Sequence, residues 1–194
     1  MTNPKTKSPL EISFVTTNLS KFEILSDLAK NYPYLKLKRL DYEISEIQNL
    51  DTESVVRSSV EFAFNLCQHP VICEDRGLYI DSLNGYPGAL VKYFDKFLDY
   101  NDILILLADK DNRKAHLKAS VGYFDGVGIP RIFSARLDGE IATKPAGQQI
   151  SSKIETLFIP TFKEQTIAQL YQTNRYLALK SHFVELLDNL MLNL

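Results

Sequence analysis

The chain has 194 residues, of which 45% are hydrophobic and 24% are charged, and its net charge is -2. This composition suits one large globular domain, or two lobes that share a core. It excludes a basic face for nucleic acid, because the basic residues are scattered, and a membrane span, because no apolar run approaches about eighteen residues.

The start of the chain differs from the rest. Residues 1–10 are polar, contain lysines and prolines and lack the apolar core of a signal peptide, so we expect a disordered lead-in before a single domain over 11–194. Cys67 and Cys73 indicate reduced thiols in a cytoplasmic protein, and a disulfide between them is the alternative.

Strands and helices alternate in the first part of the domain. Alternating or continuous apolar residues predict three strands, over 11–16, 34–42 and 71–78. A helix follows the first strand, with Ser20 and Glu23 at capping-box spacing, and Asp51 or Thr52 caps a second helix. This β-α-β-α-β order is typical of an α/β fold.

The second part of the domain has a different pattern. It predicts one or two short helices over 87–98 and another over 102–108, strands over 115–125, 130–142 and 156–159, a helix from 166 and a closing helix from about 174. The hairpin signal between the two long strands indicates an antiparallel second lobe. We expect lobe 1 at about 11–85 and 151–194, lobe 2 at about 86–150, and a cleft between them.

Two adjacent carboxylates, Glu74 and Asp75, follow the apolar start of the third strand. Neighbouring strand residues face opposite sides, so only one of them can point into a site. In open sheets ligands bind at the carboxyl ends of the strands, where both Asp75 and the turn from Asn18 to Lys21 are expected. A helix N-terminus with a nearby lysine suits a phosphate; a solvated acidic pair and a capped helix with a surface lysine are the alternatives.

The histidines give no metal signal. His69 and His116 have no cysteine or carboxylate at metal-ligand spacing nearby, so we predict no zinc site. His182 lies in the closing helix, where a partly buried structural histidine is expected. The chain also has no Gly-x-Ser-x-Gly nucleophile motif.

Seven short motifs occur in the order found in one enzyme family. They are Thr16-x-Asn18-x-x-Lys21, Glu46-Ile47-Gln48, Glu74-Asp75-x-Gly77-Leu78, Gly85-x-Pro87-Gly88, Gly139-Glu140-Ile141, Phe158-x-Pro160 and Thr166-x-Ala168. Over about residues 12–190 the chain resembles the inosine triphosphate pyrophosphatases, which remove non-standard purine nucleotides such as ITP, dITP and XTP. The resemblance implies an elongated two-lobed α/β fold with a mixed sheet and a central nucleotide cleft. It also implies a homodimer that uses Mg²⁺ to cleave a nucleoside triphosphate to the monophosphate and pyrophosphate.

The resemblance also implies roles for single residues. Attack by water on a charged phosphorus needs a divalent cation, positive donors and a carboxylate that orients the water. By resemblance, Asp75 is the general base and a Mg²⁺ ligand, and Glu46 is the second Mg²⁺ ligand. The phosphates are held by Thr16, Asn18 and Lys21.

Four departures from the family pattern concern the substrate. Ser59 replaces a lysine, and Arg76 replaces a threonine or serine, where it either supplies the lost charge or obstructs the site. The aromatic base-reading motif is replaced by residues 152–155, in which only the carboxylate of Glu155 is retained. The family's Ser-His-Arg corresponds to residues 177–179 if the leucines stay in register, or alternatively to residues 181–183.

We therefore expect a pyrophosphohydrolase of nucleoside triphosphates with altered base recognition. A degenerate member that binds nucleotide or a partner protein without catalysis is the alternative, and a phosphatase of another phosphoester is a third possibility. Neither nucleic acid nor a membrane is an expected partner. The aromatic residues of 86–98 are either a dimer surface or part of the core.

Overall fold

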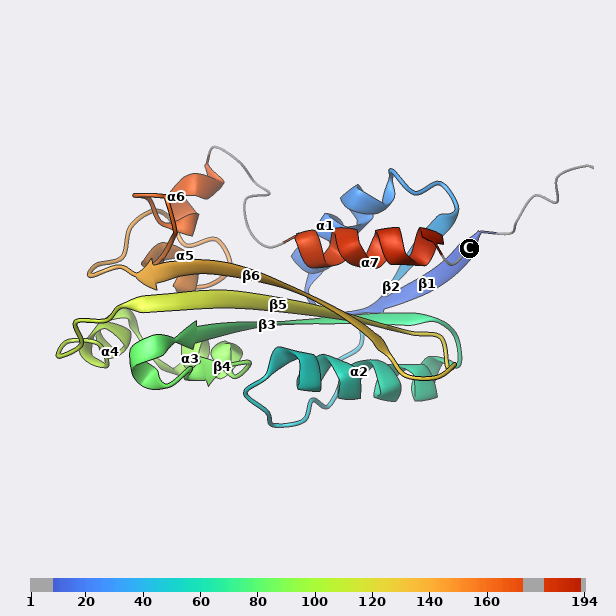
Figure 1. The fold of residues 1–194 in the computed structure, drawn as a ribbon, viewed down its shortest axis with the longest axis horizontal. Coiled ribbons are helices and arrows are strands. Elements are labelled where there is room, and N and C mark those ends of the chain that lie inside the picture. The colour runs from blue at the N-terminus through green and yellow to red at the C-terminus, as the bar shows by residue number, and fades with distance from the viewer. Residues whose placement is uncertain (1–8, 173–179, 193–194) are drawn as a thin grey trace, which may run out of the picture.

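A mixed sheet forms the centre of the computed structural model, which describes residues 9–172 and 180–192 (Figure 1). Its strands are β1 (Leu10–Val15), β2 (Leu35–Leu40), β3 (Val71–Ile80), β4 (Pro87–Gly88), β5 (Lys114–Phe124), β6 (Arg131–Ile141) and β7 (Phe158–Pro160). The seven-stranded sheet of the described residues has the order β2-β1-β3-β5-β6-β7, and β4 pairs with β3. The predicted α/β class with a mixed sheet is confirmed.

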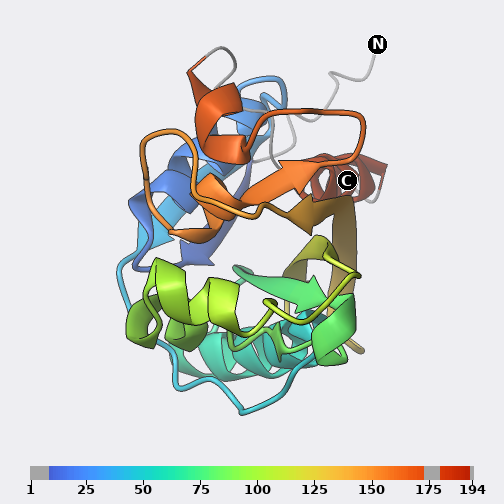
Figure 2. The same cartoon turned by 90° about the vertical axis from the view of Figure 1, so that its left-hand side faces the viewer.

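Helices cover both faces of this sheet. They are α1 (Leu19–Ala29), α2 (Thr52–Cys67), α3 (Val91–Phe97), α4 (Tyr100–Ile105), α5 (Ile154–Leu157), α6 (Ile167–Tyr171) and α7 (Ser181–Leu192), with the 3₁₀ helix η1 (Asp81–Leu83). At one end of the sheet α1 and α7 lie on one face and α2 on the other (Figure 1). At the other end, α3 and α4 (green to yellow) face α5 and α6 (orange) in Figure 2. Within the described ranges, no helix combines the length and apolar character needed to cross a membrane.

Strand direction changes at β3. β1 is parallel to both of its neighbours, β2 and β3. β3 is antiparallel to its other neighbour, β5. The antiparallel strands predicted for the second lobe are β5 and β6, and they continue the same sheet. Because the β1–β3 pairing covers only Ser13–Val71 and Phe14–Ile72, the rest of β3 extends past the end of β1. The carboxylates of β3 therefore lie beside the turn that follows β1.

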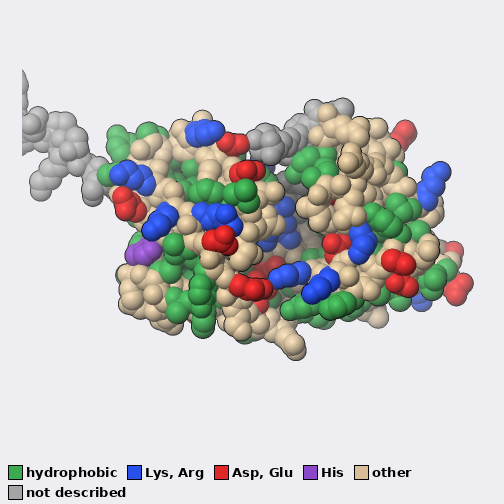
Figure 3. All heavy atoms as spheres, turned by 180° about the vertical axis from the view of Figure 1, so that it is seen from behind, with side chains coloured by type: hydrophobic (Ala, Val, Ile, Leu, Met, Phe, Trp, Pro, Cys, Tyr) green, Lys and Arg blue, Asp and Glu red, His purple; other side chains and the backbone are tan. Residues whose placement is uncertain are grey.

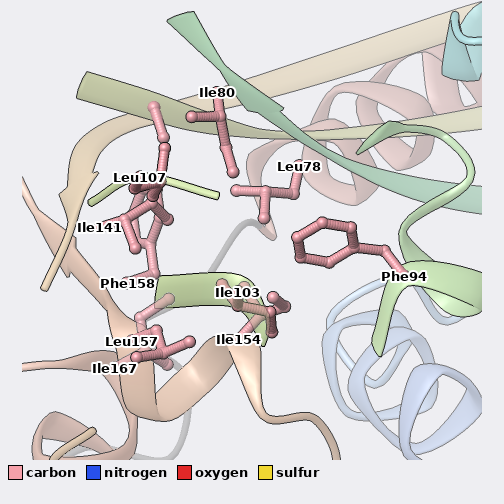
Figure 4. Packing of buried hydrophobic residues seen from close by; sticks show 11 residues of the cluster. Leu78, Ile80, Phe94, Ile103, Leu107, Ile141, Ile154, Leu157, Phe158 and Ile167 are labelled. Carbon is pink, nitrogen blue, oxygen red and sulfur yellow. The ribbon is translucent and has the colours of Figure 1, made fainter. Parts of the chain in front are cut away.

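A hydrophobic cluster fills the end of the molecule where α3 to α6 meet the sheet. Leu78 and Ile80, at alternate positions of β3, point into it with Phe94, Ile103 and Phe158 (Figure 4). A strand with apolar residues at every second position buries one face in this way. This cluster fixes the far half of β3, and with it the position of the acidic residues before Leu78.

The opposite end has a second cluster on the face of α1 and α7. Phe14 of β1 packs edge to face on Phe183 of α7, with ring centroids 6.0 Å apart, and Leu25 of α1 is fully buried beside them. Such aromatic pairs stabilise beyond the area that they bury. The cluster joins the first strand and the last helix, which come from opposite ends of the chain.

On the other face, α2 lies close to the sheet because β5 has a glycine there. A Cβ on Gly122 would meet Val56 Cγ1 at 2.6 Å and Val60 Cγ1 at 3.0 Å, so any larger residue would push α2 outward. Val56 and Val60 belong to a third hydrophobic cluster, which also contains Cys67 and Cys73. Both thiols are free, as predicted.

Several predicted boundaries need correction. Asn18 caps α1 instead of Ser20, and α1 starts before the predicted Ser20–Glu23 capping box, whereas Asp51 caps α2 as predicted. Residues 156–157 belong to α5, so the late strand begins only at Phe158. Leu10 already belongs to β1, and residues 1–8 of the predicted lead-in lie outside the described residues. The predicted start of the closing helix at about 174 also lies outside them; α7 is described from Ser181.

Candidate active site

The turn between β1 and α1 is held by a set of hydrogen bonds. The side chain of Asn18 accepts from the backbone N–H of Lys21 at 3.2 Å, and Thr16 Oγ1 accepts from the backbone N–H of Asn18 at 3.1 Å. Arg39 of β2 donates to the backbone carbonyls of Thr16 at 3.1 Å and Thr17 at 2.9 Å. Asn18 thus shapes the helix N-terminus, where unpaired backbone N–H groups suit an anion.

Glu74 is the centre of a buried cluster of charges. Its Oε2 lies 2.6 Å from Lys21 Nζ, and its Oε1 lies 2.6 Å from Arg76 Nε and 3.3 Å from His182 Nε2. Lys21 Nζ also donates to the backbone carbonyl of Glu74 at 3.1 Å. The side chains of Glu74 and His182 are fully buried. One carboxylate thereby joins α1, β3 and α7.

The ionisation of this cluster follows from its neighbours. Burial alone would raise the pKa of Glu74, but Arg76, Lys21 and His182 hold it well below the usual range. Partial burial opposes the charge on Arg76, yet the carboxylate of Glu74 raises the pKa of this guanidinium. Glu74 and Arg76 are therefore both charged at neutral pH.

Asp75 lies on the opposite face of β3, as strand alternation predicted. It pairs across the sheet with Ser120, whose hydroxyl is 2.7 Å from that of Thr52 on α2. Burial raises the pKa of Asp75 to about 7. The positive charge of Lys21 opposes this rise, and the negative charges of Glu46 and Glu74 add to it. Its Oδ2 is buried and has no hydrogen-bond partner in the described part of the chain. Such a carboxylate is a candidate general base.

Glu46 lies in the exposed loop after β2. Its charge raises the pKa of Asp75, so the two carboxylates lie close enough to repel each other. Asp75, with its unpartnered Oδ2, and Glu46 are carboxylates of the kind that bind Mg²⁺ in proteins, together with phosphate oxygens and water. No group of three or more His, Cys, Asp or Glu side chains within 9–172 and 180–192 is arranged to hold a metal, so substrate oxygens would complete this site.

The surface is hollowed between the two ends of the molecule, with acidic and basic side chains in the hollow (Figure 3). A separate surface cavity of about 540 Å³ shares no residue with the Glu74 cluster or with Asp75. It is lined by Asp81, Lys114, Ala115, Arg136, Asp138, Gly139, Glu140, Ile159, Pro160, Thr161, Phe162 and Lys163.

Comparison with known proteins assigns the chain to a family. Residues 12–178 match the model of the Ham1 family. The chain belongs to the Ham1 family. The "dITP/XTP pyrophosphatase" of Thermococcus kodakarensis is 32% identical over 163 residues, which cover 83% of this chain and 85% of that protein. The protein of the same name from Methanopyrus kandleri is 30% identical over 161 residues, with the same coverage of 83% and 85%.

Solved structures of Ham1 proteins have the same fold. The Staphylococcus aureus Ham1 protein gives a TM-score of 0.77 at 20% identity and covers 94% of this chain and 98% of its own. A Mycobacterium abscessus nucleoside-triphosphatase, described as a dITP/XTP pyrophosphatase, gives 0.72 at 22% identity and covers 86% and 92%. Together with the relatives, these matches confirm the resemblance to the inosine triphosphate pyrophosphatases.

Ser59 and Arg76, two of the departures from the family pattern, lie on opposite faces of the sheet. Ser59 is buried on α2, and its hydroxyl has no partner within the described ranges. Arg76 shares the face of Glu74 and binds it, while Asp75 faces the other way. The guanidinium of Arg76 therefore does not cover the carboxylate of Asp75.

Residues 152–155, which were expected to correspond to the aromatic base-reading motif, have a structural role in this chain. Glu155 accepts hydrogen bonds from the backbone N–H groups of residues 150–152 and from the Ser151 hydroxyl. Lys153 donates to the carboxylate of Asp95 through its backbone N–H and to the backbone carbonyl of Asp95 through Nζ. The segment thus fastens its own loop to α3. The predicted contact of Glu155 with the substrate stays a prediction. Its carboxylate already accepts four hydrogen bonds from its own loop.

His182, expected to be a partly buried structural histidine, is fully buried and lies beside Glu74. The favoured counterpart of Ser-His-Arg, residues 177–179, lies outside the described residues. The alternative, residues 181–183, lies at the start of α7, where His182 contacts Glu74 and Phe183 packs on Phe14.

Proposed function

We propose that the chain is a Mg²⁺-dependent nucleoside triphosphate pyrophosphohydrolase that acts on non-standard purine nucleotides such as ITP, dITP and XTP, with altered base recognition. The observation that carries the proposal is Asp75, whose pKa is raised to about 7 beside Glu46 and Lys21. It supports this function because the chain is a Ham1 member whose relatives bear the name dITP/XTP pyrophosphatase.

Each of the site residues has a separate role in the proposed reaction. Asp75 takes a proton from the water that attacks phosphorus, and a pKa near the working pH suits that role. Lys21 has three N–H donors, of which Glu74 occupies at most two, so one is available to a phosphate oxygen. Thr16 and Asn18 hold the turn at the α1 N-terminus in place beside the phosphates. Glu46 and Asp75 would hold Mg²⁺, which supplies positive charge to the phosphates and the leaving pyrophosphate.

Release of pyrophosphate from a panel of nucleoside triphosphates tests the function. We expect release from ITP, dITP and XTP with Mg²⁺ and none after chelation with EDTA. Glu46→Gln should raise the Mg²⁺ concentration needed for half-maximal rate by roughly tenfold or more, because one carboxylate ligand is lost.

The control is Glu43→Gln, another exposed acid of the same loop, which lies 3.6 Å from Lys92 and should leave the Mg²⁺ requirement unchanged. Release that EDTA does not affect would refute the Mg²⁺ dependence. No release from any nucleotide by folded protein, with a rise in melting temperature on adding nucleotide, would favour the non-catalytic binding protein.

The rate should also depend on pH through Asp75. Its carboxylate is protonated below its pKa of about 7, so kcat/KM should fall about tenfold per pH unit below that value. Bound Mg²⁺ favours the ionised form and should move the midpoint downward. Pyrophosphate release measured from pH 5 to 9 at two Mg²⁺ concentrations checks this. A flat profile at both concentrations would exclude Asp75 as the base.

A homodimer and a cytoplasmic location stay predictions. Within the aromatic segment 86–98, the rings of Tyr93 and Phe97 stack at 6.4 Å and are both exposed, which supports a surface role over a place in the core. Sedimentation of the purified protein over a range of concentrations tests the homodimer.

A further inference from the structure

Arg76 has unused hydrogen-bond donors. Only its Nε is paired within residues 9–172 and 180–192, with Glu74 Oε1 at 2.6 Å, and its Nη2 is buried without a partner. A guanidinium has five N–H donors, so four remain. The side chain is 32% exposed, so a ligand can reach it. Buried polar groups in native proteins are almost always paired, and this exception needs an explanation.

The guanidinium lies over a row of small side chains. In the sheet register Arg76 faces Ala119 of β5, which faces Ala135 of β6. The hydrophobic cluster of α1 and α7 lies on one side of this row and the cluster of α3 to α6 on the other. Small side chains therefore occupy the row of the sheet between the two clusters, at the level of Arg76.

Glu74 separates Arg76 from the phosphate side of the site. Lys21 and Arg76 bind different oxygens of this carboxylate. Lys21 lies close enough to Asp75 to lower its pKa, whereas Tyr171 and Glu155 lie close enough to Arg76 to raise the pKa of its guanidinium. Arg76 therefore lies across the Glu74 carboxylate from the lysine assigned to the phosphates.

We propose that Arg76 reads the base of the substrate, donating from its terminal nitrogens to O6 and N7 of a 6-oxopurine. This inference rests on the proposed function and names the residue that gives it specificity. Arginine forms paired hydrogen bonds with this edge of a purine, whereas adenine presents an amino donor at C6 that arginine cannot use. A guanidinium already neutralised by Glu74 suits a neutral base better than a phosphate.

The test compares ITP with ATP, which share ribose and phosphates and differ at C6. Arg76→Ser and Arg76→Lys should each lower the ratio of kcat/KM for ITP over ATP by about 10- to 100-fold. Lysine keeps the charge beside Glu74 and thus the fold, but it cannot form the paired contact. Calorimetric binding of IMP and AMP to the same variants should show the same loss of preference without any turnover.

Arg136→Ser, at an exposed arginine of β6 paired with Asp138, is the matched control and should keep the wild-type ratio. An unchanged ratio in folded Arg76→Lys would overturn the proposal. So would an equal loss for ITP, ATP and inorganic tripolyphosphate, because that result would make Arg76 a phosphate contact. The calorimetry separates the two hypotheses: wild-type preference for IMP without pyrophosphate release would refute the proposed function and leave base reading intact.

Discussion

Replacing Asp75 by Asn should abolish pyrophosphate release and also make the folded protein more stable. The amide cannot accept a proton from water and is a poor Mg²⁺ ligand, so the rate should fall by about 10³-fold or more. Asn keeps the shape of the side chain, so the fold should be retained. Pyrophosphate release from ITP with saturating Mg²⁺ measures the loss.

The gain in stability follows from the raised pKa. Because the pKa of Asp75 rises from 3.8 to about 7 on folding, the folded protein binds this proton more tightly than the unfolded chain does. The stability of the wild type therefore falls as the pH rises from about 4 to 7, by up to about 4 kcal/mol, and stays low above pH 7. The uncharged Asn avoids this loss.

Urea unfolding at pH 5 and pH 8 in EDTA checks the stability, with Asp109→Asn, an exposed aspartate of the α4–β5 connection, as the control. The free energy of unfolding should be higher for Asp75→Asn than for the wild type at pH 8, and the difference should shrink at pH 5. A variant that keeps the wild-type rate would show that another group acts as the base.

Replacing Glu74 by Gln should have the opposite effect on stability. The variant leaves Lys21 and Arg76, which both bind this buried carboxylate, without their counter-charge. Breaking a buried ion pair from one side costs about 3–5 kcal/mol, so we expect a loss of that size in the free energy of unfolding at pH 7. Urea denaturation measures it.

The pH dependence gives a second check on Glu74. Its pKa in the folded protein is well below the ordinary value of 4.5, so its contribution is present above about pH 4.5 and is lost as the pH falls through the folded-state pKa. The difference between wild type and Glu74→Gln should therefore shrink in acid. Glu11→Gln, at an exposed ion pair with Lys36 of 3.5 Å, should show no measurable change at any pH. A similarly small effect of Glu74→Gln would mean that the buried charges relax to water.

Much of the site could be predicted because it depends on local pattern and on a general rule of sheets. Alternation placed Glu74 and Asp75 on opposite faces, and the rule for open sheets brought Lys21 to the same end of the strands as Asp75. Both expectations agree with the register of β3 and with the contact between Lys21 and Glu74.

The rest depends on contacts between distant parts of the chain. The pattern around Glu74 says nothing about His182, which reaches it only because α7 packs its apolar face on the sheet. Similarly, the four hydrogen bonds that Glu155 accepts depend on the path of the loop before it. At the start of α1, the capping-box spacing pointed to Ser20, but the helix begins at Leu19 and Asn18 caps it.

The cluster around Glu74 also sets the order in which the site can form during synthesis. Its members come from the first helix, a central strand and the last helix, so a growing chain makes Lys21 and Glu74 long before His182. Until α7 has left the ribosome and docked, the sheet face that holds Glu74 lacks its cover. A chain cut short before residue 181 therefore keeps every residue assigned to the phosphates and to Mg²⁺, yet it cannot bury the carboxylate that positions the phosphate lysine.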